Sequence, residues 1–165
     1  MQTVDALTVS VVVDNTTDML STRPQHIASE LRVLISAGLQ ELTGEGLCSA
    51  HHGLSLAVTA RIGAQERTVL FDAGPDPYAL ERNVRRMGLN FEKIEAVVLS
   101  HGHFDHSEGL LKAIELIRGI RREHSIPSIC IRAFLFDVRF NCPMATSFRF
   151  RKFPLALLSA GRVIR

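Results

Sequence analysis

One short segment of the chain, Leu99 to Leu110, constrains the fold more than any other. It holds three imidazoles and one carboxylate within six residues, namely His101, His103, Asp105 and His106. The four residues from Ala96 to Leu99 form a continuous apolar run, which predicts a strand buried on both faces. Apolar side chains at helical spacing follow the segment and predict a helix over about 107–122. The polar cluster is therefore expected on a turn between a strand and a helix.

The spacing of these side chains suits divalent metal ions. Residues two apart in an extended segment point the same way, so His101 and His103 can present their nitrogens to one point. Asp105 and His106 lie where the chain begins to coil and face a neighbouring point. Imidazoles and carboxylates are common zinc ligands. The pattern predicts a dinuclear centre, with one metal on His101 and His103 and the other on Asp105 and His106.

Two structural interpretations compete with the metal centre. Asp105 and Glu108 fit a variant of the capping box at a helix start, and the histidines could be merely polar loop residues. A single histidine would favour that interpretation. Three histidines and an aspartate at this spacing favour the metal centre.

The motif His101-x-His103-x-Asp105-His106 after a hydrophobic strand resembles the metal-binding signature of the metallo-β-lactamase superfamily. Leu70-Phe71-Asp72-Ala73-Gly74 resembles the strand-end aspartate motif of that superfamily. With the early Asp14-Asn15 and the segment His52-Gly53-Leu54-Ser55, the chain is similar to the branch of metal-dependent hydrolases that includes dihydropterin-type aminobenzene phosphate synthases. The resemblance extends from Leu7 to about Ile131.

The resemblance implies an α/β fold, a mixed β-sheet with flanking helices, which corresponds to the N-terminal half of a four-layer αββα sandwich. It implies a hydrolase in which one or two zinc ions, or another divalent transition metal, activate water to attack an ester, thioester, lactone or phosphoester of a small molecule. Asp105 would be the catalytic residue, ligating the metal and orienting the water. The alternative is a truncated, non-catalytic metal-binding module or a partner subunit.

The ligands expected from the second half of this family are missing from the sequence. After His106 the chain offers only His124 and Asp137, and neither stands in a matching motif. We therefore expect a metallo-β-lactamase-like domain over residues 1–131. Residues 132–165 are expected to form a basic, aromatic-rich tail that is divergent or misframed, as in a truncated reading frame or a divergent short form.

Asp72 is expected at the end of a strand that neighbours the strand leading to the cluster. Metal-bound imidazoles usually donate their second N–H to a carboxylate or carbonyl, so we predict that Asp72 supports the ligands, against the alternative of a plain turn aspartate. By resemblance, His52 lies near the mouth of the site. Histidines in a glycine-rich loop are more often surface residues, so His51 and His52 are expected to be ordinary ones.

The remaining elements follow from periodicity and turn residues. Alternating residues from Leu7 to Val13 predict a strand with one face buried. The other expected elements are a helix over about 25–39, a hairpin of 54–60 with 68–71, a helix over about 77–87 and a strand over 126–131.

Charge separates the tail from the rest of the chain. The net charge is +2, but Ile131 to Arg165 holds seven basic residues and one acidic residue. Phenylalanines alternate with arginines there, yet no nucleic-acid-binding fold is recognisable, so nucleic acid is not an expected partner.

Other features bear on the compartment. Three cysteines without a close pair argue against a disulfide framework. The N-terminus lacks a signal-peptide pattern, and no apolar run reaches the ~20 residues of a membrane helix. We expect a cytoplasmic protein with no membrane association.

Overall fold

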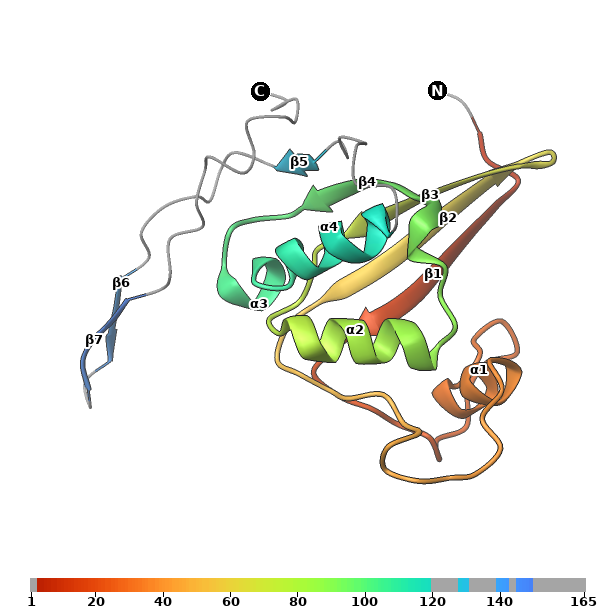
Figure 1. Ribbon diagram of the computed structural model, residues 1–165, viewed down its shortest axis with the longest axis horizontal. Helices are drawn as coiled ribbons and strands as arrows, with labels where there is room; N and C mark the ends of the chain where they lie inside the picture. Colours follow the sequence, from red (N-terminus) through yellow and green to blue (C-terminus); the bar gives the residue numbers. More distant parts are fainter. Residues whose placement is uncertain (1–2, 120–127, 131–138, 143–144, 150–165) are drawn as a thin grey trace.

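The computed structural model describes residues 3–119, 128–130, 139–142 and 145–149, with side chains over 3–119 (Figure 1). The strands are β1 (Ala6–Val13), β2 (Ser55–Ile62), β3 (Gln65–Phe71), β4 (Ile94–Leu99), β5 (Ser128–Cys130), β6 (Arg139–Cys142) and β7 (Ala145–Arg149). The helices are α1 (Glu30–Ser36), α2 (Pro77–Arg86), α3 (Phe104–Ser107), α4 (Leu110–Arg118) and the 3₁₀ turn η1 (Phe91–Lys93).

The main sheet is mixed, as predicted. Its strand order is β1-β2-β3-β4-β5, and β6 and β7 form a separate antiparallel pair. β2 pairs antiparallel with β1 and β3, whereas β4 pairs parallel with β3 and β5. Phe71 at the end of β3 lies beside Val98 near the end of β4. The segments that begin at Asp72 and at Ser100 therefore leave the same edge of the sheet.

Helices α2 and α4 lie side by side over one face of this sheet (Figure 1). The fully buried side chains between the two layers include Leu70 of β3, Val97 of β4, Leu80 of α2 and Leu110 of α4. Burying such a side chain contributes about 1.5–3 kcal/mol. The prediction of an α/β sheet with flanking helices is confirmed.

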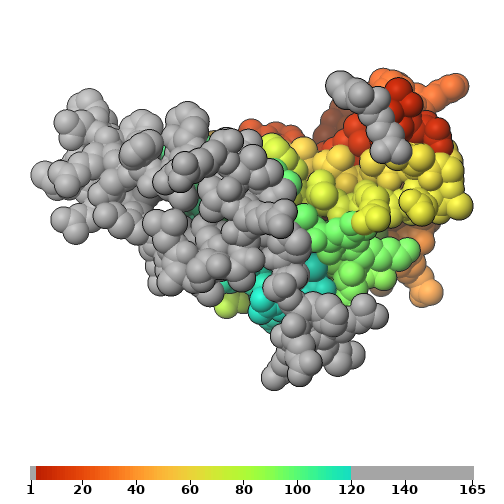
Figure 2. Space-filling view, turned by 90° about the horizontal axis from the view of Figure 1, so that it is seen from above, coloured from red at the N-terminus to blue at the C-terminus, as the bar shows by residue number. Residues whose placement is uncertain are grey.

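The sheet face opposite α2 and α4 is exposed, which differs from the prediction for the first strand. Leu7, Val9 and Val11 are 61%, 49% and 49% exposed, whereas Val12 and Val13 are buried. The expected buried face was wrong because the helices cover the other side of the sheet. Figure 2 shows β1 and the β2–β3 hairpin, in red and yellow, at the surface. In the αββα sandwich that the resemblance implies, a second sheet would cover this face.

Two predicted helices are shorter than their periodicity suggested. α1 begins only at Glu30 because the Ser29 side chain caps it, accepting a hydrogen bond from the Arg32 amide. The helix expected over 107–122 begins only after Gly109, as α4, and Ser107 instead ends the short helix α3. A Cβ at Gly109 would collide with the carbonyl of Ala73, so the chain passes too close to the segment after β3 for any other residue. No helix in the described part of the chain is long and apolar enough to cross a bilayer.

Several predictions fall on residues outside the described ones. These are His124, Asp137, the last residues of the expected helix and most of the tail from 132 onward. The boundary proposed at 131 and 132 lies there as well. The strand expected over 126–131 is represented by β5.

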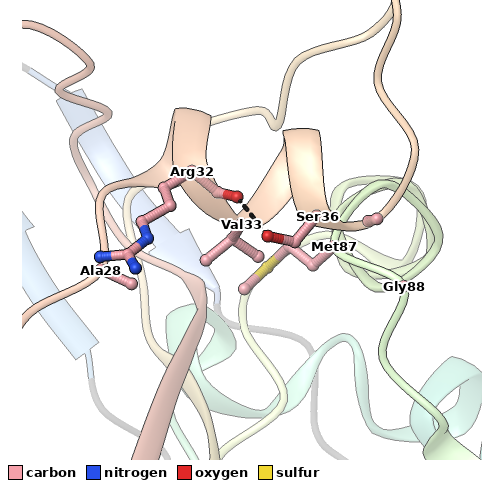
Figure 3. A pocket seen from close by; sticks show the side chains of 7 residues that line it. Ala28, Arg32, Val33, Ser36, Met87 and Gly88 are labelled. Atoms are coloured by element: carbon pink, nitrogen blue, oxygen red, sulfur yellow. Dashed lines mark hydrogen bonds between the residues drawn. The ribbon is translucent and has the colours of Figure 1, made fainter.

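Two cavities among the described residues are lined by none of the four candidate metal ligands. The smaller, of about 300 Å³, lies between α1 and the end of α2, where Arg32, Val33, Ser36 and Met87 surround it (Figure 3). The larger, of about 620 Å³, lies against β1 and the segment after it. The predicted metal site therefore lies outside both cavities.

Asn83 of α2 holds Ser49, in the loop that leads to His51 and His52, by hydrogen bonds. Its buried amide donates hydrogen bonds to the carbonyls of Val12 and Ser49 at 2.7 and 2.9 Å, and its oxygen accepts one from the Ser49 amide at 2.8 Å. A buried polar group with three partners is costly to remove because its partners then lose their bonds. Asn83 therefore joins the helix, the first strand and the loop.

We predict that Asn83→Ala lowers the free energy of unfolding by about 3 kcal/mol, near 1 kcal/mol for each lost hydrogen bond. The matched control is Asn15→Ala, at an exposed position, which should change it by less than about 0.5 kcal/mol. Urea unfolding followed by circular dichroism measures both. Equal midpoints for the two variants would show that the Asn83 bonds do not hold the loop.

Candidate metal centre

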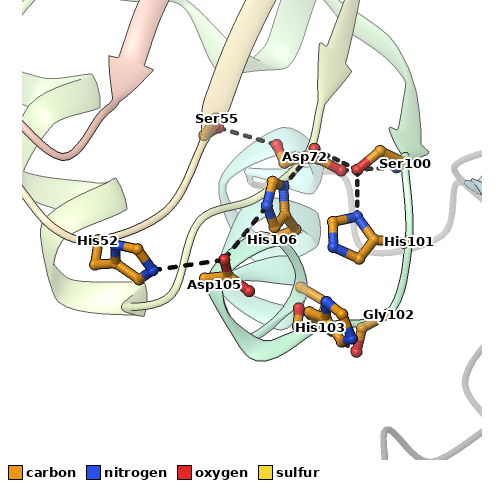
Figure 4. Close-up of polar contacts among 10 residues, drawn as sticks. His52, Ser55, Asp72, Ser100, His101, Gly102, His103, Asp105 and His106 are labelled. Atoms are coloured by element: carbon orange, nitrogen blue, oxygen red, sulfur yellow. Dashed lines mark hydrogen bonds and ion pairs between the residues drawn. The ribbon is translucent and has the colours of Figure 1, made fainter. Parts of the chain in front are cut away.

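The histidine cluster lies on the turn that leaves β4 and enters α3 (Figure 4). His103 occupies the residue before the helix, where it makes no side-chain capping bond. Asp105 is already in the first helical turn. The capping-box interpretation of Asp105 is therefore not what the structure shows, and its carboxylate is available for other contacts.

Three of the predicted ligands converge on one point. One ligand atom from each of His101, His103 and Asp105 lies within 4.8 Å of the others, and all three side chains are partly buried. The rings of His101 and His103 meet edge to face, with centroids 4.6 Å apart. Two imidazoles and a carboxylate form a donor set that suits zinc, whose catalytic sites use three protein ligands. The residues present thus fit the metal that the motif implies.

His106 lies beside this group. Its Nε2 is 3.4 Å from Asp105 Oδ2, and its ring centroid is 4.2 Å from that of His101. The structure therefore brings Asp105 to the first histidine pair, whereas the sequence pattern assigned it only to a second ion with His106. The carboxylate lies within reach of both groups, and the dinuclear centre stays a prediction.

Asp72 supports the cluster from the buried side. Its carboxylate, with no exposed area, accepts hydrogen bonds from the Ser100 amide and hydroxyl at 2.7 Å each and from His106 Nδ1 at 2.8 Å. Its backbone φ is +57°, in the left-handed region that non-glycine residues rarely adopt. Such a conformation costs about 1–3 kcal/mol and persists only where surrounding bonds fix it.

These hydrogen bonds determine which ring nitrogen carries the proton in His101 and in His106. A buried carboxylate only accepts, so the Ser100 hydroxyl donates to Asp72 and must itself accept from His101 Nδ1, 2.8 Å away. His106 Nδ1 donates to Asp72 directly. In both rings Nε2 then carries the lone pair that can ligate a metal.

The environment also favours the neutral form of His101. Burial lowers the pKa of His101, and the neighbouring imidazoles of His106 and His103 lower it further, against the opposing effect of Asp72 and Asp105. Neutral imidazole is the form that ligates metals.

Ser100 was not predicted as a site residue, and His52, although exposed as expected, lies beside the cluster. Ser100 carries a weak signal, a hydroxyl between the end of a buried strand and the first histidine of the motif. His52, expected on an ordinary surface, has its Nε2 4.0 Å from Asp105 Oδ2. His51 lies instead beside Asp76, with its Nε2 3.7 Å from Oδ2. Only its neighbour His52 reaches the cluster.

Comparison with known proteins gives a family match that spans the cluster. The model of the family described as "Beta-lactamase superfamily domain" matches residues 67–149, half of the chain. The match includes Asp72, Ser100 and the four candidate ligands.

Two relatives come from Methanocaldococcus jannaschii. An uncharacterized protein is 42% identical over 72 residues, which cover 42% of this chain and 26% of the relative. A 7,8-dihydropterin-6-methyl-4-(beta-D-ribofuranosyl)-aminobenzene-5'-phosphate synthase is 31% identical over 61 residues, which cover 37% of this chain and 21% of the relative. The matches span about a quarter or less of each relative. Because the family model matches half of the chain, the chain belongs to the beta-lactamase superfamily.

Proposed function

We propose that this chain carries the metal centre of a zinc-dependent hydrolase. The observation that carries the proposal is the convergence of one ligand atom each from His101, His103 and Asp105 within 4.8 Å. The assigned tautomer of His101 and its lowered pKa support it, because both present a lone pair to that point. We place the function in the domain over residues 1–131.

Each residue of the cluster has a role in this proposal. His101 and His103 hold the ion together with Asp105, and His106 offers a fourth donor beside the same carboxylate. Zinc bound there would supply a Lewis acid that lowers the pKa of water to about 7. Asp105 is the catalytic residue, since its carboxylate can both orient the attacking water and accept its proton. Asp72 and Ser100 keep the imidazoles in place.

The proposed substrate is a small molecule with an ester, thioester, lactone or phosphoester bond. One relative is named for a phosphate-bearing product, which supports including a phosphoester among the candidates. That relative is named a synthase, so the proposal of hydrolysis rests on the cluster rather than on the name. The free thiol of Cys48 fits a reducing compartment, and we propose the cytoplasm.

A second candidate is a metal-binding module without catalysis. It is favoured by the ligands that the resemblance requires after His106, because the sequence offers only His124 and Asp137 there and neither stands in a matching motif. Such a module would bind zinc through the same residues and turn over no substrate.

We predict that the purified chain binds zinc and that a His101→Ala, His103→Ala double variant contains more than about tenfold less, because two of its three converging ligands are gone. A His26→Ala, His51→Ala double variant, which removes two histidines outside the cluster, should keep its zinc. Elemental analysis of the dialysed proteins measures this. Equal zinc in both double variants would rule out the cluster as the binding site.

We predict that Ser100→Ala weakens zinc binding about tenfold to a hundredfold, because His101 loses the hydrogen bond that orients its ring. Ser100→Thr keeps a hydroxyl and should restore binding. Competition with a chromophoric chelator measures the affinities.

Ser55→Ala is the control for Ser100. Its hydroxyl is also buried, but it donates to the backbone carbonyl of Asp72, at 3.0 Å, and has no path to His101. Its zinc affinity should stay within about threefold of wild type. If Ser55→Ala and Ser100→Ala weaken binding equally, the effect comes from general destabilisation.

We predict that Asp105→Asn lowers turnover on the order of a hundredfold or more with zinc still bound, because the amide cannot accept the proton of water. The control Glu108→Gln removes an exposed carboxylate one turn further along and should retain activity. Turnover is followed on thioester, lactone and phosphoester substrates. If none reacts at any zinc concentration, the metal-binding module is the better account; full activity in Asp105→Asn would refute the role of Asp105.

A further inference from the structure

The backbone is fastened on both sides of His52, to the candidate metal centre after it and to the segment that follows β1 before it. The Leu54 amide donates to the Asp105 carbonyl at 3.2 Å, and the His51 amide donates to the Asp14 carbonyl at 2.9 Å. Gly53 lies so close to Asp105 that a Cβ there would collide with its carbonyl oxygen. His52 is therefore held beside the cluster by main-chain contacts.

The His52 side chain is nevertheless exposed. It is 81% accessible, against 20% for Asp105, and it points toward the cluster (Figure 4). Its Nε2 is 4.0 Å from Asp105 Oδ2, which is too long for a hydrogen bond. The ring thus buries little area and makes no short contact with Asp105, so folding alone gives little reason for its position.

The His52 ring also does not belong to the group of side chains that could bind one metal ion together. The converging ligand atoms belong to His101, His103 and Asp105, and His52 is not among them. A fixed backbone with an exposed ring at the edge of a candidate metal centre is what a substrate-binding residue needs. An imidazole N–H donates well to a charged oxygen, and the neutral ring is sufficient for this.

We propose that His52 is a substrate-binding residue, which donates a hydrogen bond to an anionic oxygen of the substrate held at the cluster. The inference rests on the proposed function and narrows its substrate class to molecules with an oxyanion, such as a phosphate group, next to the reacting bond. His52 sets specificity and leaves the metal ligands unchanged.

The test measures binding of inorganic phosphate to the zinc-loaded full chain by isothermal titration calorimetry, with zinc content determined on the same samples. His52→Ala should weaken phosphate binding about tenfold, the effect of one hydrogen bond to a charged group. His52→Gln, whose amide can donate, should stay within about threefold of wild type. His51→Ala is the matched control, because this neighbouring ring lies beside Asp76, and it should bind phosphate normally. Zinc content should be the same in all four proteins.

Several results would overturn the inference, and they separate it from the proposed function. Wild-type phosphate affinity in His52→Ala would show that the ring does not contact the anion. Loss of zinc from His52→Ala would show that the ring supports the metal ligands instead. A wild-type chain that binds zinc but no phosphate would refute the proposed anionic substrate but not the metal centre. A wild-type chain without zinc would refute both.

Discussion

The buried carboxylate of Asp72 accepts three hydrogen bonds, two from Ser100 and one from His106. A charge without exposed area is tolerated only where such bonds replace its hydration. These bonds connect the end of β3 to the end of β4 and to α3, so the same contacts that stabilise the charge also orient two imidazoles. The parallel pairing of β3 with β4 is what brings the partners together, since both chains leave the sheet at one edge.

Main-chain bonds make the site stiff independently of these side chains. Ala73 donates to the carbonyl of His106, Gly109 to that of Gly74, and Gly74 to that of Leu54. Three separate segments therefore cross at the cluster, and glycine is required where they approach most closely. A centre fixed in this way needs little rearrangement to bind an ion, which favours affinity and positions the neighbouring His52.

Because the helices cover one side of the sheet, the other face is exposed along β1. Leu7, Val9 and Val11 stay exposed although their alternation is typical of a buried face. Both matched relatives are much longer than the matched segments. The candidate site lies at the edge of the sheet, and its described contacts come from the β3, β4 and α3 side of the fold and from the segment before β2.

The sequence by itself determined where the cluster lies and which strand end supports it, because the strand, the turn and the motif are local patterns and Asp72 follows the adjacent strand. Most helix positions were predicted for the same reason, whereas the mixed sheet was implied by the family resemblance. Only the tertiary structure decided which face of β1 is covered, because alternation groups residues without saying which side meets the helices. It also made α4 begin only after Gly109, and it gave Ser100 and His52 their contacts. Ser100 meets a carboxylate 28 residues away, and no local spacing reports such a partner.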